Sequence, residues 1–399
     1  MYLLGEALNL EKKKTVFVVC LIVVILASVF SAWMLLGNNR PHGEEYKALA
    51  EQLLGEARHE FEAIRGDCVQ EVVLEVVNES WVIENWGVAY IDPEEVTMEE
   101  NIYKTLFMID QDVNLTEVKL EWTGMFHAAK WKGKIYVVEE NFDITNEFKA
   151  TSTFVHELTH IMQDDYSLPR RTTFDGTKAL SALKEGDATL MADTFKNGGV
   201  VPPSAEVVTS SSSRIPESIN NLNRFVYRYG VEFVKVLYNH DEGGWDAVTE
   251  AYKNLPNTTE QIMHPQKYFN QESAVPVESA PVTADWNLTM TDCFGEYFVL
   301  VMLDHWISVD DAELAAEGWG GDVFNYYKNG DDFLFTWDIV WDSNEDAYDF
   351  YDAFQDMMDK TPANNITDDC WFAYGRYLSI QCNENATLIV SSANEMLVQ

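Results

Sequence analysis

Residues 156–160 read His-Glu-Leu-Thr-His, and this pattern constrains the fold more than any other feature of the chain. Residues four apart on an α-helix lie one above the other, so the two imidazoles must share one helix face. An apolar stripe of helical period surrounds them and predicts a buried helix; it comprises Phe154, Val155, Leu158, Ile161 and Met162. Buried histidines beside a glutamate need partners, and a metal ion would supply one. We therefore predict a zinc-binding helix; the alternative is a helix with two satisfied core histidines and a solvated glutamate.

The third ligand must come from elsewhere, because a hydrolytic zinc usually has three protein ligands and one open position for water. The metzincin pattern is excluded, since it requires Gly and His where this chain has Gln163 and Tyr166. Residues 179–191 read as a mostly apolar helix with Glu185 in its middle, where a carboxylate is costly unless it is paired or bound to metal. Glu185 is therefore the predicted ligand, and Asp187 is its rival.

The two segments together, His-Glu-Leu-Thr-His and the Ala-Leu-Lys-Glu-Gly-Asp-Ala of residues 182–188, resemble the gluzincin branch of zinc metallopeptidases. The resemblance covers about residues 130–200 and implies a zincin-like α+β fold, a Zn²⁺ cofactor and a peptide or protein substrate. It also implies that Glu157 is the general base. The metal ligands that it implies are His156, His160 and Glu185.

The chain departs from this branch at one position. Some gluzincins carry an aspartate four residues after the ligand glutamate, where it orients a ligand histidine, but this chain has Thr189 there. Asp164, one turn after His160, is the predicted replacement. Residues 259–265 and 318–322 are similar to parts of a poorly characterised prokaryotic, membrane-anchored relative.

The chemistry that follows is metal-assisted hydrolysis. Zinc lowers the pKa of its water toward about 7, and Glu157 would take the water proton and pass it to the leaving amine. Relatives often use a Tyr or His as oxyanion donor, and His264 and Tyr268 are candidates by residue type alone; a structural histidine at a helix end is an equal reading of His264. Residues 134–139 read as a strand that could border the cleft and pair with an extended peptide, or as an ordinary sheet strand.

Two other functions fit the same motif. A cell-surface binding or adhesion protein could use a zincin scaffold with a structural or lost zinc, although a purely structural site would not need the general base Glu157. A hydrolase of another amide or ester bond would keep the same fold and motif. Zinc content, measured together with hydrolysis of an unstructured protein, separates these alternatives.

A membrane anchor is predicted near the N-terminus. Residues 15–36 are uncharged and apolar, and about 20 such residues cross a bilayer. Lysines at 12–14 precede this stretch, so the positive-inside rule places residues 1–14 in the cytoplasm and residues 38–399 outside the cell. The rival reading is a cleaved signal peptide with weak small-residue sites near residues 29–31, but the apolar run is longer than such peptides usually have.

Cysteines and glycosylation sequons agree with an exterior location. Cys20 lies in the predicted span, and the four cysteines outside it are an even number compatible with two disulfides, Cys370–Cys382 and, by elimination, Cys68–Cys293. The alternative is free buried thiols. Six N-x-S/T sequons, at Asn78, Asn114, Asn257, Asn287, Asn365 and Asn385, suit a glycosylated exterior surface, although about three would arise by chance.

The formal net charge of −39 excludes nucleic-acid binding and predicts a well-solvated surface that repels anionic polymers. Acidic clusters such as residues 342–346 raise the question of calcium. The EF-hand pattern fails there, because Ala347 and Ala353 occupy its sixth and twelfth positions. We predict that these clusters are solvated faces and helix caps.

The predicted organisation is a catalytic part over residues 38–200, with a twisted mixed sheet leading into the metal-site helices, and a mainly helical part over residues 201–399 that completes the cleft. Gly186 predicts a close approach of two helices. The first part is expected to contain helices at 43–65 and 93–109, strands at 71–77 and 81–91, and a hairpin within 118–139. The second is expected to contain a lid or surface loop at 199–213, helices at 216–255 and 346–357, a loop at 318–321, and a hairpin at 376–381 and 386–390.

Overall fold

The computed structural model of the chain describes residues 40–203, 212–279 and 285–398. The predicted cytoplasmic tail and membrane span, residues 1–14 and 15–36, lie outside these ranges, as does most of the predicted loop at 199–213. Within the described ranges, no helix is both long and apolar enough to cross a bilayer.

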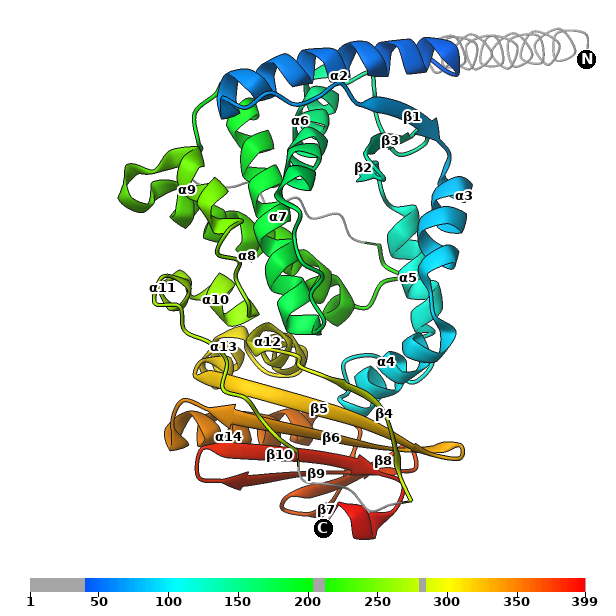
Figure 1. The fold of residues 1–399 in the computed structure, drawn as a ribbon. Helices are drawn as coiled ribbons and strands as arrows, with labels where there is room; N and C mark the ends of the chain where they lie inside the picture. The colour runs from blue at the N-terminus through cyan, green and yellow to red at the C-terminus, as the bar shows by residue number, and fades with distance from the viewer. Residues whose placement is uncertain (1–39, 204–211, 280–284, 399) are drawn as a thin grey trace, which may run out of the picture.

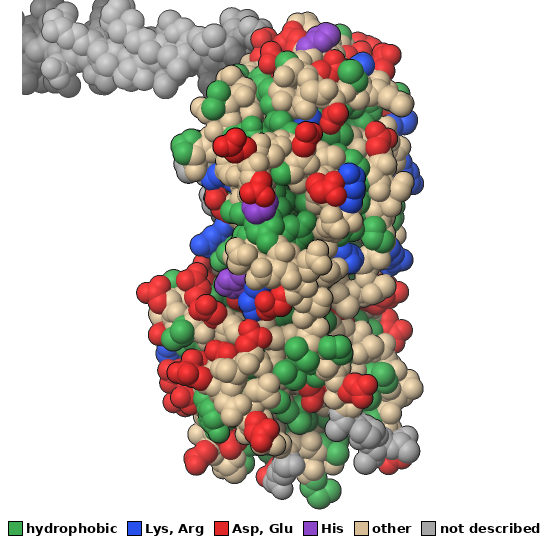
Figure 2. Space-filling model, turned by 60° about the vertical axis from the view of Figure 1, so that its left-hand side comes forward, with side chains coloured by type: hydrophobic (Ala, Val, Ile, Leu, Met, Phe, Trp, Pro, Cys, Tyr) green, Lys and Arg blue, Asp and Glu red, His purple; other side chains and the backbone are tan. Residues whose placement is uncertain are grey.

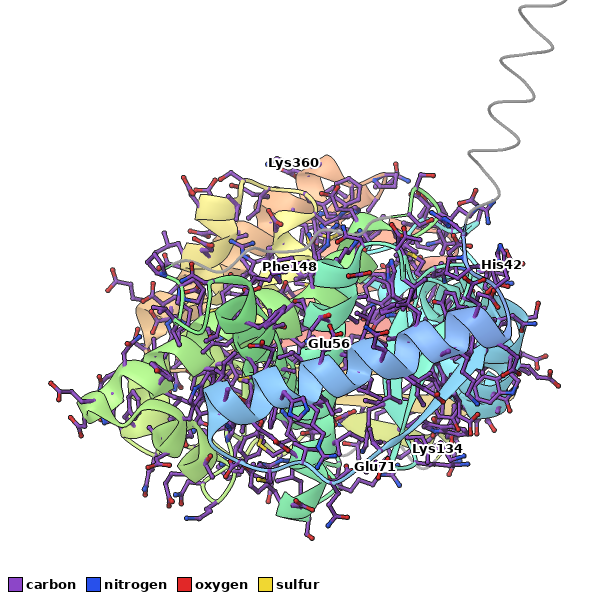
Figure 3. All side chains as sticks on the ribbon, turned by 90° about the horizontal axis from the view of Figure 1, so that it is seen from above. His42, Glu56, Glu71, Lys134, Phe148 and Lys360 are labelled. Atoms are coloured by element: carbon purple, nitrogen blue, oxygen red, sulfur yellow. The ribbon has the colours of Figure 1, made fainter. Side chains whose placement is uncertain are left out.

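The molecule is layered from one long helix at the top to a large sheet at the bottom (Figure 1). Helix α2 (Glu44–Arg65) crosses the top, as the view from above also shows (Figure 3). One face of this helix is apolar and buried, and Gly66 ends it in the left-handed conformation with φ 81°. The prediction of a helix at 43–65 is thus confirmed.

A small sheet lies under α2 with the strand order β1-β3-β2. β1 (Val73–Val77) is parallel to β3 (Lys134–Val138), which pairs with the antiparallel β2 (Ala128–Trp131). The predicted hairpin is confirmed, with Lys132 and Gly133 turning the chain at φ 50° and 72°. β2 is therefore an edge strand and β3 is central.

The segment between β1 and β2 is helical. It contains α3 (Glu79–Val82), a π turn (Ile83–Gly87), a 3₁₀ turn (Val88–Tyr90), α4 (Pro93–Thr105) and α5 (Leu115–Gly124). The predicted strand at 81–91 is wrong: the side chain of Asn78 caps α3 by accepting a hydrogen bond from the Trp81 N–H. The predicted helix at 93–109 is present but ends at Thr105.

The middle of the molecule is built by α6 (Glu147–Gln163), α7 (Phe174–Lys196) and α8 (Glu217–Asn239). Glycines let α7 and α8 touch: a Cβ on Gly186 would lie 2.2 Å from the Gly230 carbonyl oxygen, and one on Gly230 would lie 2.3 Å from that of Ala182. The close approach predicted from Gly186 is thus confirmed. Three short helices follow, α9 (Gly244–Ala251), α10 (Thr259–Met263) and α11 (Pro265–Phe269).

A seven-stranded antiparallel sheet, ordered β4-β5-β6-β10-β9-β8-β7, forms the bottom. Its strands are β4 (Asn287–Asp292), β5 (Trp319–Asn329), β6 (Asp332–Trp341), β7 (Asn364–Thr367), β8 (Cys370–Ala373), β9 (Arg376–Asn383) and β10 (Ala386–Ser392). Helices α12 (Glu296–Asp304), α13 (Val309–Ala316) and α14 (Asn344–Lys360) accompany it.

This sheet corrects the prediction of a mainly helical second part. β5 and β6 bury side chains on both faces, so their sequences lack the alternation that marks a half-exposed strand. The predicted loop at 318–321 is largely the start of β5, where Gly321 admits the carbonyl of Val275. The helix predicted at 346–357 and the hairpin of β9 and β10 are confirmed, and the chain as a whole is α+β as predicted.

The predicted disulfides are absent: Cys68, Cys293, Cys370 and Cys382 are free thiols. Cys370 pairs with Ser379 across β8 and β9, three residues from Cys382, which puts the two cysteines about 10 Å apart along the strand and on opposite faces. The Cys293 thiol donates to Asp322, whereas Cys68 is exposed near the end of α2. Acidic side chains are spread over the face shown in Figure 2, as the net charge predicts.

Candidate functional site

Three predicted ligands meet where α6 lies beside α7. The Nε2 atoms of His156 and His160 are 3.1 Å apart, and Glu185 Oε2 lies 3.3 Å from the first and 3.4 Å from the second. Ligand atoms at about 2.0–2.1 Å from a tetrahedral zinc are themselves about 3.3–3.4 Å apart. The three side chains therefore form one triangular face of the tetrahedron that zinc prefers.

The two helices are held in place by ordinary local signals. The side chain of Asn146 caps α6 by accepting from the Lys149 N–H, and Thr173 caps α7 by accepting from the Gly176 N–H. The predicted apolar stripe of α6 is largely buried, and Phe148 on its first turn stacks on Phe195 of the last turn of α7. The helices are thus antiparallel neighbours.

The electrostatics of the triangle favour positive charge. Burial opposes a charge on His160, but the adjacent Glu185 carboxylate outweighs it and raises the pKa of His160 to about 9. Burial alone would raise the pKa of Glu185, and the two imidazoles instead hold that pKa below its usual range. A cation at the centre of the triangle would find a carboxylate and two imidazole nitrogens already aimed at it.

Gln163 fixes the orientation of His160. Its Nε2 donates to the Lys184 carbonyl at 3.0 Å and to Tyr252 Oη at 2.8 Å, so its Oε1 faces His160 Nδ1 at 2.9 Å and accepts from it. A proton on Nδ1 leaves the lone pair of Nε2 directed into the triangle. The prediction that Asp164 orients His160 is wrong, because the Asp164 carboxylate instead pairs with the Lys130 ammonium group.

Asp187, the rival ligand, belongs to a different interaction. Its carboxylate receives the Arg65 guanidinium at 2.5 Å and the Tyr252 hydroxyl at 2.8 Å, and the ion pair is fully buried. Arg65 is the last residue of α2, so this pair fastens α2 to α7 behind the triangle. Glu185 rather than Asp187 therefore joins His156 and His160 in the group of side chains that could hold a metal ion.

Glu157 lies next to the triangle and is 5 % exposed. One of its oxygens accepts a hydrogen bond from the backbone N–H of Lys130 in β2, while its Oε2 is buried and has no hydrogen-bond partner among the described residues. Burial raises the pKa of Glu157. A buried carboxylate oxygen without a donor is costly, and a water or substrate in the adjacent cleft would supply one.

A cleft of about 420 Å³ opens onto these residues. Its walls come from α5, β2, α6, α7 and α8. Tyr227 of α8 lines it, and the nearby Glu185, burial and Glu157 raise the pKa of its phenol well above the usual range. The phenol therefore stays protonated and can donate a hydrogen bond.

Sequence reasoning missed Tyr227. It lies three residues before Gly230, so the glycine contact that joins α7 to α8 also brings Tyr227 to the level of Glu185. The predicted donors are wrong: His264 Nε2 contacts Glu296 Oε1 at 2.8 Å, and the Tyr268 hydroxyl donates to the Asn254 carbonyl. Neither lines the cleft.

The edge of the small sheet beside the cleft is β2. The prediction that residues 134–139 border the cleft is therefore wrong, because β3 is paired on both sides. Residues 126–130 line the cleft, and β2 pairs on one side only. Its free side can accept an extended chain.

A second group of carboxylates, from Glu260, Glu272 and Asp342, surrounds an ammonium group. Lys267 Nζ lies 2.6, 2.9 and 3.0 Å from these three carboxylates. Lysine thus already supplies the cation at this place.

Residues 285–398 match a family described as a domain of unknown function (DUF8575). The match covers the seven-stranded sheet with α12, α13 and α14, and it contains none of the residues of the triangle. Comparison of the chain with curated proteins and with solved structures found no match.

Proposed function

We propose that this protein is a zinc-dependent metallopeptidase with a zincin-like catalytic part. The observation that carries the proposal is the triangle of His156, His160 and Glu185, whose edges of 3.1–3.4 Å suit tetrahedral zinc, beside the unpaired buried oxygen of Glu157. A binding protein with a structural zinc would have no use for that oxygen. The gluzincin-like spacing of the motif supports the same conclusion.

Each residue of the site has a separate role in the proposed hydrolysis. A zinc ion held by the triangle would acidify a water molecule and polarise the scissile carbonyl. Glu157 accepts the proton of the attacking water on Oε2 and delivers it to the leaving amine. Tyr227 donates its phenolic proton in a hydrogen bond to the oxyanion as negative charge develops there. Gln163 keeps His160 in the tautomer that presents Nε2.

The substrate would bind as an added strand. An extended peptide in the cleft can pair with the free side of β2 through backbone hydrogen bonds, which are independent of side-chain identity. Since Lys130 of β2 also donates to Glu157, the same strand would align the peptide and hold the base. This arrangement favours peptides over small amides and esters.

The proposed location is the outer face of a cell membrane. It rests on the apolar residues 15–36 and the lysines before them. Of the predicted glycosylation sites, Asn287 and Asn365 are exposed in the edge strands β4 and β7, whereas the side chain of Asn385 donates to the Trp341 carbonyl. We expect glycans at the first two positions.

The test is hydrolysis of an unfolded protein by the full chain, with its zinc content measured on the same sample. We expect about one zinc per chain, turnover that a chelator abolishes, and recovery on adding zinc. Glu157→Gln should keep the zinc and lose the turnover, and Glu147→Gln on the exposed first turn of α6 is the matched control. Bound zinc without turnover in the unaltered chain would favour the binding-protein alternative.

A further inference from the structure

A second pocket, of about 390 Å³, adjoins the cleft. Its walls come from the segment around Trp86, from α4, α5, α7 and α8, and aromatic rings including Trp122 and Phe174 contribute to them. Lys119 of α5 and Lys178 of α7 line it, and the Lys178 ammonium group lies 5.5 Å from the centre of the Phe174 ring. A chamber lined by aromatic rings together with polar side chains, with the Lys178 ammonium group at its wall, is suited to a ligand with an apolar body and one anionic group.

The second pocket and the cleft lie along one face of α7. Phe174 and Lys178 line the pocket, and Glu185, Thr189, Ala192 and Lys196 continue the same stripe through the cleft at spacings of seven, four, three and four residues. Lys178 precedes the ligand Glu185 by nearly two turns, or about 10 Å along the helix. Trp122 lines both spaces, so they are neighbours rather than opposite sides of the molecule.

Lys178 has little to neutralise it. Its Nζ donates to the Leu222 carbonyl at 2.8 Å, and it forms no ion pair within residues 40–203, 212–279 and 285–398. The carboxylate that lines the pocket, Glu99, is held by Lys119 at 2.8 Å and by the Tyr103 hydroxyl at 2.9 Å. Burial lowers the pKa of Lys178 to about 8, which fits an ammonium group without a carboxylate in contact.

Accordingly, we propose that the second pocket is a distal substrate site in which Lys178 binds a carboxylate of the peptide. The inference rests on the proposed peptidase function and adds a substrate class, peptides with a carboxylate near the scissile bond. About 10 Å corresponds to about three residues of extended chain, so the carboxylate would stand about three residues from that bond. It can come from a Glu or Asp side chain or from the C-terminus.

Glu/Gln scanning of one peptide series tests the proposal. Each position on both sides of the scissile bond carries Glu in one peptide and Gln in its partner, and a further pair has a free or an amidated C-terminus three residues beyond the bond. We expect the acidic member to be preferred at least about tenfold in kcat/KM at one position about three residues away, since a hydrogen bond to a charged group is worth that much. The two arms distinguish a side-chain carboxylate from a C-terminal one.

Variants of Lys178 test whether the preference for the acidic peptide arises in the second pocket. Lys178→Met should abolish it while leaving turnover of the Gln or amide peptide within about twofold, and Lys178→Arg should retain it. Lys360→Met makes the same change at the outer edge of the molecule (Figure 3) and should behave like the unaltered chain. Equal turnover of every acid–amide pair, or a preference that survives Lys178→Met, would overturn the proposal while leaving the peptidase intact.

A binding measurement separates this proposal from the proposed function. If no peptide is hydrolysed, 3-phenylpropionate and its amide can be compared by ligand-observed NMR with the chain in chelator, where no zinc can capture the acid. We expect the acid to bind, the amide to bind at least about tenfold more weakly, and Lys178→Met to lose the difference. Equal binding of acid and amide to the unaltered chain would refute the site.

Discussion

Two buried carboxylates, Asp322 in the sheet half and Glu157 in the helical half, differ in how far their oxygens are hydrogen-bonded. In the sheet half, Asp322 of β5 accepts from the Gly295 N–H and the indole of Trp319 on Oδ1, and from the Phe294 N–H and the indole of Trp337 on Oδ2. In the helical half, Glu157 leaves one oxygen without a donor. Both oxygens of Asp322 are thus satisfied within the chain, whereas Glu157, like Asp193 and Glu296, keeps one buried oxygen without a donor among the described residues.

The largest expected effect is on the unsatisfied carboxylate. Glu157→Gln removes the base but keeps the shape of the side chain, so hydrolysis should fall about a thousandfold or more while zinc content and thermal midpoint stay unchanged. Steady-state kinetics with an unfolded protein substrate measure the hydrolysis, and calorimetry measures the thermal midpoint. Retained turnover in this variant would show that Glu157 is not the general base.

The complementary change in the sheet half should act on stability alone. Asp322→Asn turns an amide group toward buried N–H donors and leaves some of them unpaired, so the free energy of unfolding should fall by about 3 kcal/mol. Denaturant unfolding measures it, with Asp331→Asn in the exposed turn between β5 and β6 as the control. Turnover per folded molecule should not change, and a loss of turnover would mean that the halves are coupled.

Tyr227→Phe tests whether the phenol of Tyr227 acts as the hydrogen-bond donor in the cleft. Removing the phenolic hydroxyl would delete the proposed transition-state donor, so kcat should fall about a hundredfold with little change in KM. Tyr229→Phe is the matched control on the same helix, because Tyr229 packs on Phe225 and Tyr297. If the two variants have equal kcat, Tyr227 is not the donor.

The smallest expected effect concerns the residue behind His160. Gln163→Met keeps the volume but cannot accept from Nδ1, so zinc affinity should fall about tenfold. Competition with a chromophoric chelator measures the affinity, and Gln52→Met on the outer face of α2 serves as the control. Unchanged affinity would show that Gln163 does not set the tautomer.

The parts of the site that sequence could predict are those fixed by local spacing. His156, Glu157 and His160 follow from helix periodicity, and Glu185 from the cost of a carboxylate in an apolar helix. Tyr227 could not be found this way, because a contact between α7 and α8 brings it to the cleft. The same holds for Gln163, whose neighbours Lys184 and Tyr252 come from other elements.

The fold was predictable where periodicity was clear. Helix α2 shows a stripe and a glycine stop, and the hairpin of β2 and β3 has its turn residues. The large sheet was hidden because β5 and β6 are apolar on both faces, and the segment 81–91 misled because its alternating apolar residues lie in short helical turns. Cysteine counting failed because an even number of thiols does not fix their separation.

The ion pair of Arg65 with Asp187 sets where the chain can be cut. A fragment that began after Arg65 would leave Asp187 as an uncompensated charge in a dry interior, and breaking such a pair costs about 3–5 kcal/mol. Asp187 lies two residues from Glu185, so the loss would fall on the helix that carries the proposed third ligand. A recombinant form that is to keep the proposed catalytic part must therefore start upstream of Glu44 and carry α2 with it.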